Sequence, residues 1–150
     1  MKSRLIMLAT ALLAMALLAG CGGLSKADYE KEMNKISKKG DKIDKQLESG
    51  EIKTDGDVKE LADDIDELAD EAGDISPPSD IKDLHEDLVD NLHDNADLMR
   101  EAGKIGMFSD PSGIDSEKME ALNKKGEATD KESKRIEKAF KAKKYKIDFD

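Results

Sequence analysis

Apolar residues in this chain recur every three or four positions among long runs of charged residues, and this spacing limits the fold to helices that are buried along one face. The first such run steps by 4, 3, 4, 3 and 4 residues along Tyr29, Met33, Ile36, Gly40, Ile43 and Leu47. Charged residues make up 40% of the chain, whereas aromatic residues make up 3%. A β-sandwich or barrel would require more aromatic strand residues and more turns. The sequence therefore predicts an all-α protein.

Short breaks divide the periodic part of the chain into four predicted helices, over about 29–49, 55–74, 80–103 and 115–144. Because the connections are short, neighbouring helices should run antiparallel. We therefore expect an antiparallel four-helix bundle over residues 26–146, followed by a tail at 147–150. Three long helices define this bundle, and whether the fourth stays docked is left open.

Several residues predict where these helices begin and end. Gly50 is a C-terminal cap for the first helix, and Thr54 with Asp57 has the spacing of a capping box at the start of the second. Ser79 is an N-cap for the third helix after two prolines. The last six residues, from Tyr145, alternate apolar and charged side chains, and without a partner strand they predict a frayed or packed tail.

The fourth predicted helix has a weak apolar face. Its middle is formed by Gly126, Thr129 and Ser133, which lie between Leu122 and Ile136. Burial there is either poor or achieved by the close approach of another helix. A small apolar ligand would be sought at this place, because bundle interiors host pockets.

The N-terminus has the parts of a bacterial export signal. Lys2 and Arg4 precede an apolar run over 5–18, whose helix would rise only about 21 Å against a hydrocarbon core of roughly 30 Å. The run ends in Leu18-Ala19-Gly20-Cys21, which resembles the lipobox of bacterial lipoproteins. An ordinary secretory signal cleaved near Ala19, with no role for Cys21, is the alternative.

The resemblance implies that the chain is cleaved between Gly20 and Cys21, that residues 1–20 are lost, and that Cys21 carries a diacylglycerol. Residues 21–25 would then be a short lipidated tether. The resemblance also implies a lipid-anchored protein on the extracytoplasmic face of the cell membrane, or of the outer membrane where the cell has one. Beyond the lipobox, the chain is similar in composition to small uncharacterised helical lipoproteins of bacterial envelopes, which implies no defined activity.

Charge is unevenly distributed along the chain. Residues 51–97 hold eighteen Asp or Glu against three Lys, a net of −15, and residues 134–146 hold seven Lys or Arg against one Glu, a net of +6. The two segments either pair with each other or meet outside partners. The basic candidates for contact with anionic lipid headgroups are Lys138, Lys141, Lys143 and Lys144. The acidic candidates for binding a cationic protein, on a face that is otherwise simply solvated, are Asp63, Asp66, Glu67, Asp70 and Glu71.

Motifs for catalysis are not found in the sequence. The two histidines, His85 and His93, fall on one predicted helix, and no nucleophile elbow or phosphate-binding glycine loop occurs. The single Cys excludes an intramolecular disulfide. His85 is a candidate metal ligand, with a partly buried structural histidine as the alternative. We expect no enzyme activity, no cofactor and, from the net charge of −10, no nucleic-acid partner.

These observations favour a non-enzymatic interaction module of the cell envelope that binds another protein through an acidic helical face. The alternative is a lipoprotein that binds a small solute or a metal ion inside the bundle. The sequence does not identify the partner or the oligomeric state.

Overall fold

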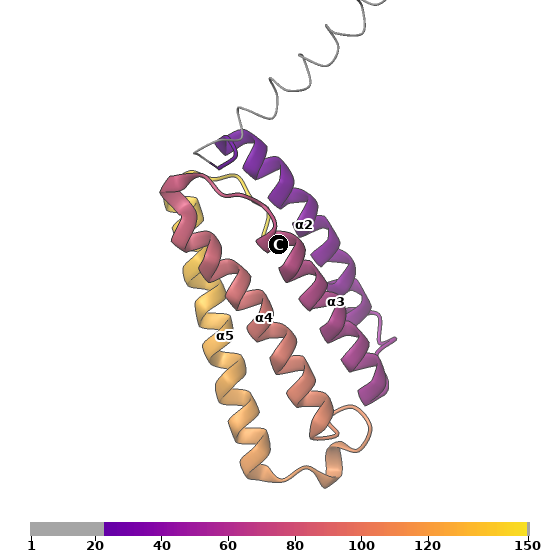
Figure 1. Ribbon diagram of the computed structural model, residues 1–150. Coiled ribbons are helices and arrows are strands. Elements are labelled where there is room, and N and C mark those ends of the chain that lie inside the picture. Colours follow the sequence, from indigo (N-terminus) through magenta and orange to yellow (C-terminus); the bar gives the residue numbers. More distant parts are fainter. Residues whose placement is uncertain (1–22, 150) are drawn as a thin grey trace, which may run out of the picture.

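The computed structural model describes residues 23–149, so the predicted signal peptide and Cys21 lie outside the described residues. Within that range the chain forms four helices and two short 3-10 turns, and no strand (Figure 1). The helices are α2 (Lys26–Glu48), α3 (Asp55–Gly73), α4 (Lys82–Lys104) and α5 (Ser116–Ala142). The turns are η1 (Ser79–Ile81) and η2 (Pro111–Gly113). The predicted all-α bundle is confirmed.

Local sequence signals explain most helix ends. Ser25 caps α2, and Thr54 and Asp57 form the predicted capping box at the start of α3. Gly50 follows the end of α2 with a φ of +70°, a left-handed conformation that glycine adopts without steric cost. The predicted N-cap at Ser79 is wrong: this residue begins η1 instead, because Ile81 N donates to Pro78 O at 3.1 Å and tightens the chain into a 3-10 turn before α4.

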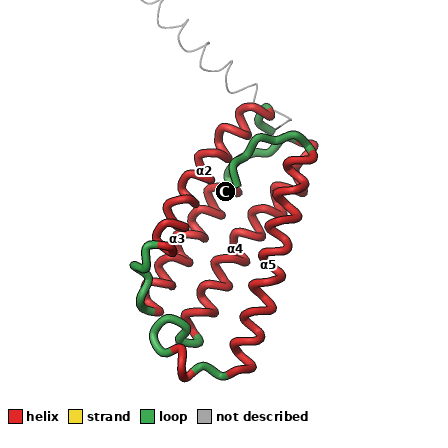
Figure 2. The backbone as a smooth tube through the Cα atoms, turned by 180° about the vertical axis from the view of Figure 1, so that it is seen from behind, coloured by secondary structure: helices red, strands yellow, loops and turns green. Residues whose placement is uncertain are grey.

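Each helix packs against the next one along the chain, in antiparallel order (Figures 1 and 2). The fourth contact of a closed bundle is missing, since no Cα atom of α5 lies within 8 Å of one in α2. The bundle therefore has an open seam between its first and last helices. No helix in the described part of the chain has the length and hydropathy to cross a membrane.

The C-terminal tail fills one half of this seam. Alpha5 ends at Ala142, and the chain turns at Lys144, whose φ is +60°. Tyr145 and Ile147 are buried, and Phe149 is half-buried against Phe140, with ring centroids 5.6 Å apart. The tail thus packs into the core, which is the second of the two outcomes expected from its alternating sequence.

The tail is bonded to α2 by side chains of that helix. Asn34 Nδ2 donates to Lys146 O at 2.9 Å, and Asp148 N donates to Asn34 Oδ1 at 2.8 Å. Ser37 Oγ donates to Asp148 O at 2.6 Å, and Lys146 N donates to Glu30 Oε1 at 2.9 Å. An extended segment buried beside a helix needs such partners, because the main chain of the helix has already used its own hydrogen bonds.

Candidate binding surfaces

The half of the seam that the tail does not fill is a groove, which we call the α2–α5 groove. It has a volume of about 510 Å³, and Phe149 lines it beside the helices. Its α2 wall is formed by Gly40, Ile43, Asp44 and Leu47, and its α5 wall by Asp130, Ser133, Lys134, Ile136 and Glu137. Its floor is mainly apolar and comes from α3 and α4, through Ile65, Leu68, Leu88, Asn91, Leu92, Asn95, Leu98 and Met99. A second hollow of about 140 Å³ shares residues with it and continues beneath the tail to Met33.

A buried amide explains how the weak middle of the fourth helix is packed. Asn91 of α4 is 4% exposed, accepts a hydrogen bond from Ser133 Oγ at 2.7 Å and donates to Thr129 O at 3.3 Å. Gly126 is not required by a close approach, because a Cβ built there would lie 3.6 Å from Leu98 Cδ2, an ordinary van der Waals contact. The middle of α5 is therefore docked by the polar pairing of Asn91 with Ser133 and Thr129.

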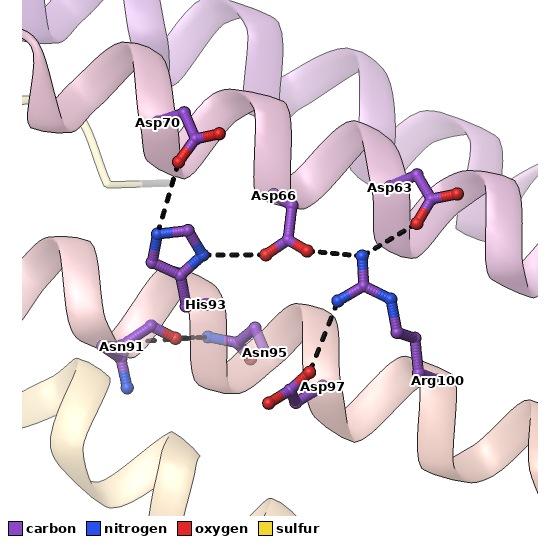
Figure 3. A network of polar contacts seen from close by, with 8 residues as sticks. All are labelled: Asp63, Asp66, Asp70, Asn91, His93, Asn95, Asp97 and Arg100. Atoms are coloured by element: carbon purple, nitrogen blue, oxygen red, sulfur yellow. Dashed lines mark hydrogen bonds and ion pairs between the residues drawn. The ribbon is translucent and has the colours of Figure 1, made fainter.

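A second candidate surface is a network of charged side chains across α3 and α4, which we call the acidic network (Figure 3). It comprises Asp63, Asp66, Asp70, His93, Asp97 and Arg100. Arg100 Nη2 lies 2.8 Å from Asp63 Oδ1 and also pairs with Asp66, while Nη1 lies 3.3 Å from Asp97. None of these six residues lines the α2–α5 groove, so the two surfaces are separate.

Asp66 is the centre of this network. Its second oxygen lies 2.8 Å from His93 Nδ1, and His93 Nε2 lies 3.7 Å from Asp70. Partial burial alone would raise the pKa of the Asp66 carboxyl, but hydrogen bonds from His93 and Arg100 lower it overall. Hydrogen bonds to Asp63 and Asp66 in turn raise the pKa of the Arg100 guanidinium. The network contains four carboxylates and one guanidinium, so its net charge is −3 when histidine is counted as neutral.

The five acidic residues singled out from the sequence thus have different surroundings. Asp63, Asp66 and Asp70 belong to the acidic network. Glu71 pairs with Lys39 of α2, and Glu67 is exposed on the same side of α3, where it lines a shallow hollow with Lys39 and Lys42. The structure therefore divides the predicted acidic face into a side that faces α4 and a side that faces α2.

His85, the candidate metal ligand, lies in the aromatic core. It is 4% exposed, and its Nδ1 lies 2.9 Å from the hydroxyl of Tyr29. Its Nε2 is buried without a hydrogen-bond partner. Burial lowers the pKa of the imidazole. Residues 23–149 contain no group of three or more His, Cys, Asp or Glu side chains arranged to hold a metal ion.

The predicted basic residues lie near the start of the described chain. Leu24 N donates to Ser76 O at 3.0 Å, and Lys26 Nζ donates to Lys143 O at 3.0 Å, so residues 23–26, the 74–82 connection and the end of α5 meet at one end of the molecule (Figure 1). We call it the anchor end. Lys143 Nζ also donates to Asp80 O at 2.6 Å, Lys141 pairs with Glu137, and Lys138 and Lys144 are exposed.

An ion pair joins the basic segment 134–146 to the acidic segment 51–97 along the length of the bundle. Arg135 of α5 lies 2.5 Å from Asp87 of α4 and 2.6 Å from its neighbour Glu132. This contact agrees with the self-pairing alternative for Arg135, whereas Lys141 pairs with Glu137 of its own helix. Self-pairing therefore accounts for Arg135, and contact with anionic lipid headgroups stays a prediction for the four lysines.

The α2–α5 groove was not predicted from the sequence. The heptad pattern identified Gly40, Ile43 and Leu47 as core residues, since periodicity shows which face is apolar but not whether a partner covers it. The polar Asn91, in the middle of an apolar stripe of the third helix, was the available signal of an unusual interface. Comparisons with protein-family models, with curated proteins and with solved structures found no match to this chain.

Proposed function

We propose that this protein is a lipid-anchored, non-enzymatic module on the extracytoplasmic face of a bacterial membrane, where it binds another protein. The proposal of an anchor rests on the resemblance of Leu18-Ala19-Gly20-Cys21 to a lipobox. Two or three acyl chains on Cys21 would hold the chain stably on a bilayer, where a single chain would give only marginal binding.

The geometry of the anchor end supports this orientation. Leu24, three residues after Cys21, is bonded to the 74–82 connection, so a lipid on Cys21 would keep the anchor end close to the bilayer. Lys138, Lys143 and Lys144 lie on or near that end, where anionic headgroups would attract them by about 1 kcal/mol per basic side chain. The sides of the bundle would remain accessible to a partner.

The observation that carries the proposal of protein binding is the excess of negative charge on the α3–α4 face. Although Arg100 and His93 together contact all four of its carboxylates, the acidic network keeps a net charge of −3, and the Asp70 side chain is 80% exposed. Internal pairing holds these carboxylates in fixed positions, and such a face favours fast encounter with a cationic partner.

Chemical crosslinking in intact cells, followed by mass spectrometry, tests this function. The lipidated chain should capture one reproducible protein, and capture should weaken for Cys21→Ser, which should also lose fatty-acid labelling and leave the membrane fraction. Continued labelling of Cys21→Ser would refute Cys21 as the lipid acceptor. The absence of a reproducible partner would refute the interaction module.

Charge reversal then tests the acidic face. Asp70→Lys combined with Glu67→Lys should weaken capture, because both carboxylates are exposed, while Glu127→Lys on α5 serves as a control. Asp66 is unsuitable for this purpose, since its reversal would break the contacts to Arg100 and His93. Unchanged capture by the double variant, with an unchanged circular dichroism spectrum, would exclude the acidic face as the binding surface.

The second candidate function, binding of a small solute or a metal ion in the bundle interior, is favoured by the α2–α5 groove, whose volume falls in the range of ligand sites. A ligand that binds the folded state raises its stability by RT ln(1 + [L]/Kd), so a melting screen of solutes and ions tests this function. A metal-dependent shift that disappears in His85→Leu would support the role of His85 as a ligand.

A further inference from the structure

We propose that the α2–α5 groove is a docking site for a cationic amphipathic helix of another protein, which would lie between α2 and α5 as the missing neighbour of both. This docking site rests on the proposed function only in that the bound partner is a protein. It is separate from the acidic network.

The apolar floor of the groove requires a cover. Leu68 and Leu88 are buried among the helices, whereas Ile65, Leu92, Leu98 and Met99 are only half-buried. Leu47 on the α2 wall is 39% exposed, one of two large apolar side chains with such exposure in the described part of the chain. In the anchor half of the seam the equivalent surface is covered by Tyr145 and Ile147 of the tail, so residues 23–149 cover this seam only as far as Phe149.

The dimensions suit a short helix. The groove runs along α4 from Leu88 to Met99, and eleven residue steps of 1.5 Å give about 16 Å, which is the length of three helical turns. A helix of that length presents apolar side chains at positions i, i+4 and i+7, the pattern with which helices occupy grooves.

The chemistry of the α2 wall favours a helix over an extended peptide. The extended tail is held by Asn34 and Ser37, side chains that can donate to its carbonyl groups. Further along the same helix the groove and the hollow that continues it are lined by Gly40, Asp41, Ile43, Asp44 and Leu47, none of which can donate a side-chain hydrogen bond while the two carboxylates are ionised. A helix satisfies its own main-chain groups and needs no such donors.

The charge of the lining selects a cationic partner. The groove and the hollow that continues it contain five carboxylates, Asp41, Asp44, Asp130, Glu137 and Asp148, and one ammonium group, Lys134, a net of −4. Asp130 pairs with Lys134, and Glu137 pairs with Lys141. Asp41 and Asp44 on the α2 side are therefore the carboxylates that lysine or arginine side chains flanking the apolar stripe of a bound helix would meet, while anionic lipid headgroups would be repelled.

Peptide binding to the lipidated chain from Cys21 onward, held in nanodiscs of phosphatidylcholine, tests the proposal. The probe is a fluorescent fourteen-residue peptide with leucine at i, i+4, i+7 and i+11 and lysine and alanine elsewhere, read out by anisotropy against empty nanodiscs. Two control probes replace every lysine by glutamate or place proline at the centre to prevent helix formation. Dodecylamine, a single-chain cationic amphiphile, is added as a competitor in a separate arm.

Two pairs of protein variants locate the binding. Leu47→Ser removes an exposed apolar side chain from the groove, and Met107→Ser removes one of similar exposure (37%) elsewhere. Asp44→Lys reverses a groove charge, and Glu127→Lys reverses an exposed charge of α5 that does not line the groove. We expect Leu47→Ser and Asp44→Lys each to weaken binding by about tenfold, a difference of about 1.4 kcal/mol, while Met107→Ser and Glu127→Lys leave it unchanged. Both control probes should bind at least about tenfold more weakly than the lysine probe.

Equal binding of the lysine and glutamate probes, or equal binding by Leu47→Ser and the unmodified chain, would overturn the proposal. Loss of binding in the double variant Asp70→Lys and Glu67→Lys, with binding by Asp44→Lys unchanged, would place the peptide on the α3 face, which overturns the groove and leaves the proposed function intact. Strong binding of dodecylamine with none of the peptide would identify the groove as a small-molecule site, which overturns both the helix and the evidence for a protein partner here.

Discussion

The hydroxyl of Tyr29 and Nδ1 of His85 are 2.9 Å apart in the core, and this contact joins α2 to α4 across the bundle. Tyr29 is fully buried, and its ring stacks against the ring of Phe140 and packs edge to face with the ring of Tyr145. The contact therefore connects a polar pair to the aromatic cluster on which the C-terminal tail packs. The other ring nitrogen of His85 has no partner, so the core accommodates the neutral imidazole better than the charged one.

Stability should therefore fall in mild acid. The pKa of His85 is 6.5 when the chain is unfolded and is lowered in the fold by burial. Below pH 6.5 the unfolded chain binds a proton that the folded chain resists, so the free energy of unfolding decreases as the pH falls from 6.5 toward the lower folded value. Urea denaturation at pH 8, 6.5 and 5 measures this slope. His85→Gln should flatten it over that range, and an unchanged slope in this variant would show that another group is responsible.

Arg100 should stabilise the α3–α4 contact modestly. Arg100→Met leaves Asp63 and Asp66 without their shared cation, and because the side chains are 25%, 56% and 29% exposed, solvent screening limits the loss to about 1 kcal/mol. Lys124→Met, which removes an exposed pair with Glu120, is the matched control and should change stability by less than about 0.5 kcal/mol. Denaturation midpoints of the two variants provide the comparison, and equal midpoints would contradict the role assigned to Arg100.

The tail should contribute to global stability. Ile147→Ala removes a side chain that is 8% exposed between α2 and the aromatic cluster, and should cost about 2–4 kcal/mol. Lys146→Ala, next to it and exposed, should be nearly neutral, because Lys146 contacts α2 through its main-chain groups. A small effect of Ile147→Ala on thermal unfolding would mean that the tail leaves the seam in solution.

Glycine at position 23 should be required for the close contact between the start of the described chain and Pro77. A Cβ at this position would lie 1.7 Å from Pro77 O, so Gly23→Ala must displace the chain from the 74–82 connection. We expect faster hydrogen exchange at the Leu24 amide, which donates to Ser76 O, with little change in the exchange of α4. Gly56→Ala, whose Cβ would have its nearest neighbour at 3.4 Å, is the control. Unaltered hydrogen exchange at the Leu24 amide would contradict the close contact between Gly23 and Pro77.

Much of the fold could be predicted because helices are local structures. The 4-3 spacing from Tyr29 to Leu47 indicated an amphipathic helix, Thr54 and Asp57 a capping box, and Gly50 a helix end, since each signal depends on neighbours within one or two turns. The prediction of an N-cap at Ser79 was wrong because it used only the residue type. The main-chain hydrogen bond from Ile81 N to Pro78 O forms a 3-10 turn there instead.

The sequence by itself determined four one-sided helices, their order and the uneven charge between residues 51–97 and 134–146. Only the tertiary structure decided that α2 and α5 remain apart, that Ile147 covers half of the seam, and that Asp66 is held by His93 and Arg100 of another helix. The physical reason is that periodicity specifies which side of a helix avoids water, whereas its partner on that side depends on how side chains distant in the sequence fill a shared volume.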